Sequence, residues 1–159
     1  MGSPGAIAAL AAAAALCAAS QAGAVGSGAA LYDANCALCH QRGGTGLRGQ
    51  FPRLAGRVAG IGRTPKGRSY LLQVILNGMA GQVSVDGEKI VGVMPSFRML
   101  SDEQIAAILS YVMALPGGVA PAESSIRVQQ VAAVRRAAAV SPNAMSERRA
   151  VLLKTQPGR

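Results

Sequence analysis

The sequence predicts an all-α fold of three to four helices, interrupted by a small β-hairpin near residues 82-91. The strongest helix signal begins at Ser101, a good N-cap residue with Gln104 three positions later, which is the pattern of a capping box. Asp102 and Glu103 then suit the positive end of the helix dipole. The apolar residues that follow recur at helical spacing and give the helix one apolar face: Ile105, Ile108, Leu109 and Val112.

Glycine and proline mark the other boundaries. A middle helix is expected over residues 69–76 (SYLLQVIL), where Asn77-Gly78 is a stop signal. Between residues 82 and 91 the side chains alternate around Asp86-Gly87, which predicts two strands joined by a tight turn. The last helix is expected to end at Pro116-Gly117-Gly118.

The first residues have the composition of a secretory signal. Residues 6–19 form an apolar, alanine-rich run followed by small residues, as in the apolar region and cleavage zone of an export signal. The run is short for a membrane-spanning helix. No Lys or Arg precedes it, which departs from the usual signal. We expect residues 1-24 to be cleaved, together with Cys17, and the mature chain to be periplasmic.

Cys36-Ala37-Leu38-Cys39-His40 has the Cys-x-x-Cys-His pattern of covalent haem attachment. Two thiols one helical turn apart reach the two vinyl groups on one side of a porphyrin, and the adjacent imidazole reaches the iron. The pattern therefore predicts Cys36 and Cys39 as the covalent attachment points of one haem c, with His40 as an axial iron ligand.

Other interpretations of this pattern are weaker. A redox-active dithiol would need the alternating strands and helices of a thioredoxin-like fold, which the sequence does not suggest. A structural zinc site needs four ligands, and no further Cys or His follows His40. A disulfide across two residues would leave His40 unexplained.

His40 is the only histidine in the chain, so a second histidine ligand is excluded within one subunit. The remaining soft, neutral ligand is methionine. We expect Met94 to fill this role, because Gly92 precedes it and Pro95 follows it in a presumed irregular loop. Met79 and Met99 are the alternatives, whereas Met113 reads as core and Met145 as surface or tail packing.

From Gly28 to Pro116 the chain resembles the class I c-type cytochromes, small helical carriers with one haem. Four segments match in order: GAALYDAN at 28–35, FPRLAG at 51–56, VMPSF at 93–97 and LSDEQI at 100–105. The resemblance implies a cytochrome c fold of three to four helices around one haem, here spanning residues 25-116. The hairpin before the methionine loop is similar to that of longer cytochrome domains in dehydrogenases, where it would cover a haem edge. A surface hairpin without function is the alternative.

The same resemblance implies roles for further residues. The carbonyl of Pro52 would accept a proton from the His40 nitrogen that does not bind iron. Arg57 would pair with a haem propionate, and Tyr70 would lie beside the haem. With His40 and Met94 both on the iron, the site suits transfer of single electrons between exported redox partners, on the dehydrogenase or oxidase side, rather than enzymatic turnover. The alternative is a haem enzyme or a gas or redox sensor with a labile methionine ligand.

The chain carries a formal net charge of +9. Residues 41–69 contain seven Lys and Arg residues and no acidic one. Such a segment would steer redox partners with acidic docking surfaces, or it is simply a solvated basic loop. A nucleic-acid partner is not expected, because aromatic interleaving and recognition motifs are absent.

The segment 117-159 is expected to be a basic C-terminal extension, partly helical or disordered. Residues 124–140 have the pattern of an amphipathic helix, with Val131 on its inner face, and a second short helix is expected after Ser141-Pro142. The extension is either an arm that docks on a complex or a membrane, or a poorly ordered tail.

Overall fold

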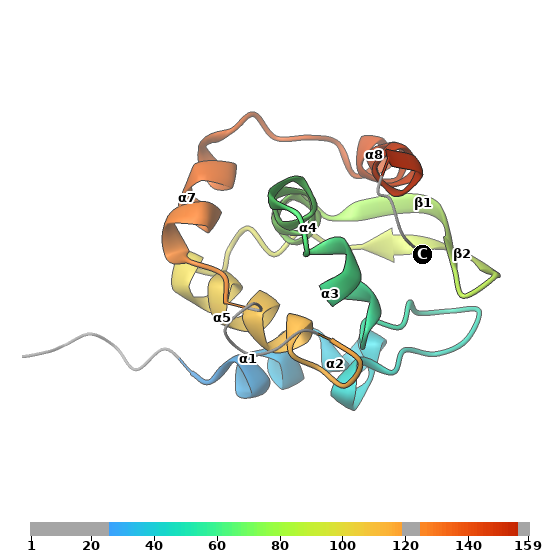
Figure 1. The fold of residues 1–159 in the computed structure, drawn as a ribbon, viewed down its shortest axis with the longest axis horizontal. Coiled ribbons are helices and arrows are strands. Elements are labelled where there is room, and N and C mark those ends of the chain that lie inside the picture. The colour runs from blue at the N-terminus through green and yellow to red at the C-terminus, as the bar shows by residue number, and fades with distance from the viewer. Residues whose placement is uncertain (1–25, 119–124, 156–159) are drawn as a thin grey trace, which may run out of the picture.

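A computed structural model describes residues 26–118 and 125–155 of the chain (Figure 1). The expected signal peptide, residues 1-24, lies outside the described residues. The α-helices are α1 (Gly28–Asn35), α2 (Ala37–His40), α3 (Arg57–Ile61), α4 (Pro65–Asn77), α5 (Asp102–Met113), α7 (Val128–Arg136) and α8 (Pro142–Thr155). A short 3-10 helix, η1, spans Arg42–Gly44.

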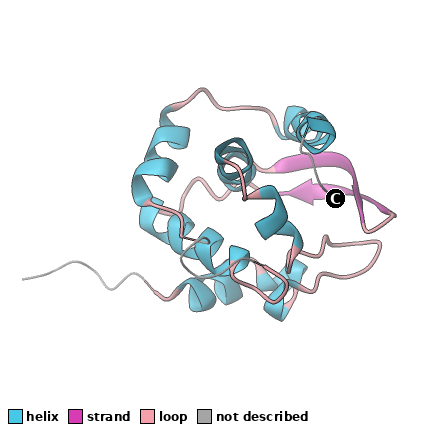
Figure 2. Ribbon diagram, viewed as in Figure 1, coloured by secondary structure: helices cyan, strands magenta, loops and turns pink. Residues whose placement is uncertain are grey.

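The described residues thus form a mainly helical fold with one two-stranded sheet (Figure 2). They contain more α-helices than the three to four expected, because α2 and α3 are single short turns without a clear periodicity, and the extension adds α7 and α8. The middle helix also starts earlier than expected. Thr64 caps its first turn by accepting a hydrogen bond from Gly67 N at 3.0 Å, and Pro65 occupies its first turn.

The expected hairpin is present and is longer than its sequence pattern. Strands β1 (Met79–Val85) and β2 (Glu88–Met94) pair antiparallel from Met79 opposite Met94 to Val85 opposite Glu88. The turn residues Asp86 and Gly87 both have positive φ, at 52° and 82°. Two such residues match the right-handed twist of the flanking strands, which explains the Asp-Gly turn.

Helices α1 and α5 cross at Gly28, where the backbones approach closely. A Cβ atom at Gly28 would collide with the carbonyl oxygen of Ala107 and lie 2.9 Å from Cβ of Tyr111. The rings of Tyr32 and Tyr111 pack next to this crossing, with centroids 5.3 Å apart. The resemblance implied such a crossing at this glycine, and the geometry at Gly28 confirms it.

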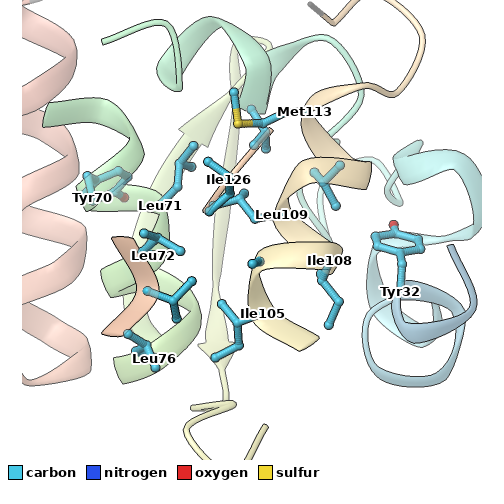
Figure 3. Packing of buried hydrophobic residues seen from close by; sticks show 14 of the residues in the cluster. Tyr32, Tyr70, Leu71, Leu72, Leu76, Ile105, Ile108, Leu109, Met113 and Ile126 are labelled. Atoms are coloured by element: carbon cyan, nitrogen blue, oxygen red, sulfur yellow. The ribbon is translucent and has the colours of Figure 1, made fainter. Parts of the chain in front are cut away.

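A single cluster of buried apolar side chains joins α1, α3, α4, α5, α7 and α8. Figure 3 shows part of it, with Tyr70 at one edge and Tyr32 at the other. Seven of its side chains are less than 2% exposed: Tyr32, Leu72, Leu76, Ile105, Met113, Val131 and Met145. Met113 is buried as expected, and Met145, which was expected at the surface or in tail packing, belongs to this common core.

The described part of the extension is tied to the rest of the fold by hydrogen bonds as well. Arg135 of α7 donates to the Asp102 carboxylate at 2.6 Å and to the carbonyls of Arg98 and Leu100 at 2.7 Å each. Ser146 of α8 donates to the carbonyl of Ala80 in β1 at 2.8 Å. Figure 1 shows α8 lying beside β1. The extension therefore packs as part of the fold throughout residues 125–154.

None of the helices within residues 26–118 and 125–155 combines the length and the hydropathy that a membrane crossing requires.

Candidate cofactor-binding cleft

An apolar cavity of about 150 Å³ opens between α1, α4, α5 and the hairpin. A second hollow of about 350 Å³ adjoins it and shares His40, Met79 and Met94 as lining residues. Protein interiors are normally close-packed, with few voids larger than a water molecule. Adjoining hollows with largely apolar walls therefore indicate a site for a large apolar ligand.

His40 is held with one ring nitrogen directed at a backbone carbonyl. Its Nδ1 lies 2.9 Å from the carbonyl oxygen of Pro52, as the sequence analysis expected of this pair. Because a carbonyl oxygen only accepts, Nδ1 must donate, and Nε2 of the neutral ring keeps its lone pair. Burial lowers the pKa of His40, against the opposing effect of the Pro52 hydrogen bond. The ring is thus prepared to bind a metal through Nε2.

The two cysteines lie at the junction of α1 and α2. Cys36 lines both hollows and Cys39 lines the second, and both thiols are free and half-buried. Burial, and then the neighbouring Cys39, raise the pKa of Cys36 to about 11. The turn is fixed by hydrogen bonds from Cys36 N to Tyr32 O at 2.8 Å and from His40 N to Cys36 O at 2.9 Å. Helical geometry therefore presents both thiols and the imidazole to the same cleft.

Two methionines reach this cleft. Met79 and Met94 line both hollows, whereas Met99 is 78% exposed and lines neither of them. The expected irregular loop is wrong in part: Gly92 and Met94 belong to β2, and the strand ends at Pro95 because proline cannot continue the ladder. The segment after it is fixed to α4, since Ser96 Oγ donates to Leu76 O at 2.7 Å and Phe97 N donates to Ile75 O at 2.9 Å.

Tyr70 and Arg57, both expected near the cofactor, also line the first cavity. The Tyr70 hydroxyl is buried and, among the described residues, is the one buried side-chain polar atom without a hydrogen-bond partner. Arg57 donates to Asp86 at 2.8 Å, and Arg53 donates to the same carboxylate at 2.9 Å. The hydrogen bond from Arg53 lowers the pKa of Asp86, with Arg57 adding to the effect.

The fold brings acidic residues to the basic segment that the sequence shows without any. Arg48 donates to Glu88 at 2.8 Å, so both turn-flanking carboxylates of the hairpin contact residues 41–69. Arg149 of α8 is a cleft residue that the sequence analysis missed. No spacing relates it to Cys36 or His40, because α8 reaches the cleft through tertiary packing alone.

The residues present fit a haem. Free thiols at the attachment spacing, an imidazole with an available Nε2, thioethers in the same cleft and apolar walls form the donor set that a covalently held haem requires. The buried, unpartnered hydroxyl of Tyr70 adds a donor for a polar group of such a ligand. A zinc site does not fit, since no group of three or more His, Cys, Asp or Glu that could hold a metal occurs among the residues described.

Comparison of sequences gives the same direction. Residues 23–112, more than half of the chain, match the family described as cytochrome c oxidase, cbb3-type, subunit III. The chain is 52% identical over 85 residues to cytochrome c-552 of Thermus thermophilus, covering 54% of this chain and 64% of that protein. For a cytochrome c-552 from a second strain of the same species, the identity is again 52% over 85 residues, covering 57% of that protein.

A more distant relative is the cytochrome c subunit of the quinone alcohol dehydrogenase of Gluconobacter oxydans. It is 33% identical over 96 residues, which cover 60% of this chain and 19% of that subunit. The chain thus spans less than two thirds of the length of each of these relatives.

Proposed function

The chain belongs to the cytochrome c family described as cbb3-type cytochrome c oxidase subunit III, and from this premise we propose that it carries single electrons between exported redox partners through one covalently bound haem. The observation that carries the proposal is the convergence of Cys36, His40 and Met94 on one apolar cleft. Bound haem would supply an iron that alternates between the ferric and ferrous states.

The chain's own residues would hold and orient that group. Cys36 and Cys39 would form the thioether bonds, and His40 would bind through Nε2 while Pro52 fixes its ring. Met94 would bind from the hairpin side, and its neutral thioether favours the reduced state. Two protein ligands leave no open coordination position, so the site suits electron transfer and not turnover of a substrate.

The cleft walls serve the same purpose. Leu71, Val74 and Ile108 line the cavity and exclude water from it. A dry, packed site changes little between two charge states, and this keeps the reorganisation that accompanies electron transfer small. The walls supply packing and dielectric rather than reactive groups.

A docking surface surrounds the mouth of the second hollow. Leu38 and Val93 line this hollow and are 89% and 77% exposed. Large exposed apolar side chains grouped at a cleft favour a protein contact. Arg48, Arg53 and Arg57 contact the hairpin carboxylates, so steering of an acidic partner would rest mainly on other basic residues, among them Arg42 and Arg63.

The partners are proposed on the dehydrogenase or oxidase side, in the periplasm. One relative is named as the cytochrome c subunit of a quinone alcohol dehydrogenase, which supports association of the present chain with an oxidoreductase complex. The basic extension adds a means of association with such a complex or with a membrane surface.

Expression of the full chain in a host that matures c-type cytochromes tests the proposal. We expect haem to remain on the polypeptide after denaturing electrophoresis, with one haem per chain, and the oxidised protein to show the long-wavelength absorption band of methionine-ligated haem. The Cys36→Ser, Cys39→Ser variant is the matched control and should retain none. A wild-type chain without covalent haem, or holoprotein that binds carbon monoxide readily, would contradict the proposal.

The steering component is tested separately by the rate of electron transfer to an acidic redox protein. The rate should fall as ionic strength rises, because salt screens the attraction between exposed charges. A rate independent of salt would contradict steering and leave the carrier function intact.

A further inference from the structure

Arg149 of α8 and Tyr70 of α4 line the same cavity as the residues proposed to hold the haem. Resting on the proposed function, we infer that these two residues hold one propionate of the haem, so that the C-terminal extension is part of the cofactor site. Arg57 was expected to take this role from the sequence, whereas residues beyond 116 were not expected to reach the cofactor.

The hydroxyl of Tyr70 carries the first step of the inference. It is enclosed within the fold and has no hydrogen-bond partner there, and it faces a cavity whose walls are otherwise largely apolar. Buried hydroxyls in native structures nearly always have a partner. The partner is therefore expected from the ligand of this cavity, and it must accept a hydrogen bond from Tyr70.

The charge of the cavity carries the second step. Its lining includes Arg53, Arg57 and Arg149 and no carboxylate. Arg53 and Arg57 are bound to Asp86 at the turn of the hairpin. Arg149 acts on Tyr70 itself: burial raises the pKa of Tyr70, and the positive charge of Arg149 opposes that rise. A guanidinium and a hydroxyl on one wall match a carboxylate, which accepts from both.

The extension holds Arg149 in place, which is the third step. The core residues Met145 and Leu152 of α8 are 0% and 4% exposed, and Ser146 donates to Ala80 O of β1 at 2.8 Å. Arg148, next to Arg149, points to a different place, because it donates to Gln73 at 2.8 Å and is exposed. Helix α8 is thus fixed against α4 and β1 with one arginine on the cavity and its neighbour outside it.

Haem is an apolar macrocycle with two carboxylates, so a cavity that is apolar over most of its wall and cationic at one corner suits it. The inference assigns Arg149 and Tyr70 to the same propionate. The remaining donors of Arg57 lie on the same cavity and also on the neighbouring hollow that Arg149 lines. The charged corner of the site is therefore built partly from the extension.

The test compares the holoproteins of wild type, Arg149→Gln, Tyr70→Phe and Arg148→Gln. The reduction potential is measured against pH, and the propionate bending band is recorded by resonance Raman spectroscopy. An opposite charge within reach lowers a carboxyl pKa by about 1 to 3 units, so Arg149→Gln should move the propionate-linked step of the potential upward in pH by about that amount. Tyr70→Phe should move the step in the same direction by less, and both variants should shift the Raman band.

Arg148→Gln removes the same charge from the same helix and should leave step and band at the wild-type position. Arg149→Lys keeps the cation and should restore most of the step, which separates a charge contact from a general loss of packing. In the double variant the two shifts should be non-additive, as expected for two donors on one acceptor.

Superimposable profiles for wild type, Arg149→Gln and Tyr70→Phe would overturn the inference, and so would equal shifts from Arg148→Gln and Arg149→Gln. Covalent haem content is measured on every sample. Wild-type protein without haem would refute the proposed function, whereas haem-loaded protein with unmoved steps would refute this inference alone.

Discussion

Met79 and Met94 stand directly opposite each other at the open end of the β-hairpin, and both line the cleft that contains His40. Residues opposed in an antiparallel pair point to the same face of the sheet. Two thioethers are therefore available to one site, although the proposed iron site has room for one of them. Met94 is followed by a segment fixed to α4 through Ser96 and Phe97, which holds the end of β2 in place.

Met94→Ala should abolish the long-wavelength band of the oxidised protein and lower its reduction potential, because loss of a thioether ligand destabilises the ferrous state. Met79→Ala is the matched control and should retain the band with little change in potential. Absorption spectra and potentiometric titration of both holoproteins measure the difference. The reverse pattern, with the band lost only in Met79→Ala, would move the ligand assignment to Met79.

Gly28→Ala should lower the free energy of unfolding by about 1 to 3 kcal/mol, because the new methyl group would force the α1 and α5 backbones apart at Ala107. Gly60→Ala in α3 is the control: its Cβ would meet nothing within 4 Å, and alanine favours a helix over glycine. Urea unfolding followed by circular dichroism measures both. Equal stability of the two variants would show that the crossing at Gly28 relaxes without cost.

Arg135→Ala should destabilise the protein by about 1 to 3 kcal/mol, since Asp102 and the carbonyls of Arg98 and Leu100 all lose a donor. Arg135→Lys should recover only part of the loss, because a single ammonium group cannot reproduce the planar fork of donors. Arg136→Ala, at an exposed neighbour, serves as the control. Thermal unfolding monitored by far-ultraviolet circular dichroism distinguishes them, and a silent Arg135→Ala would contradict a structural link between α7 and α5.

Asp86→Asn should lower stability by at most about 1 kcal/mol at neutral pH, because its ion pairs with Arg53 and Arg57 are partly exposed. The hydrogen bond from Arg53 holds the pKa of Asp86 below its usual value, so the carboxylate contributes stability above that usual value. The contribution is lost as pH falls through the lowered pKa. Wild type and variant should therefore converge in acid, as urea titrations from neutral to strongly acidic pH would show; a difference that persists in strong acid would assign the effect to something other than charge.

Local patterns in the sequence predicted a large part of the fold. Ser101 and Gln104 form the expected capping box, with hydrogen bonds of 3.3 and 2.9 Å. The Asp86-Gly87 turn and the stop after Asn77 appear where they were expected. Each of these signals depends on residues a few positions apart, so its energy is already present in the local chain. The start of α4 was missed because Thr64-Pro65 precedes a polar turn with no apolar periodicity.

Other features depended on contacts between distant segments. Which methionines reach the cleft, and how the hairpin carboxylates meet the basic residues 41–69, follow from packing between segments that are far apart in the chain. The sequence favoured Met94 on the basis of a loop that proved to be the end of a strand, so its reason was wrong in part.

The sequence by itself determined the attachment pattern at Cys36, Cys39 and His40, because a single helical turn sets the spacing of all three. Only the tertiary structure decided that Arg149 lies on the same cavity as Tyr70. Burial of Met145 and Leu152 fixes α8 against α4 and β1, and that apolar packing places a residue from the far end of the chain at the cofactor site.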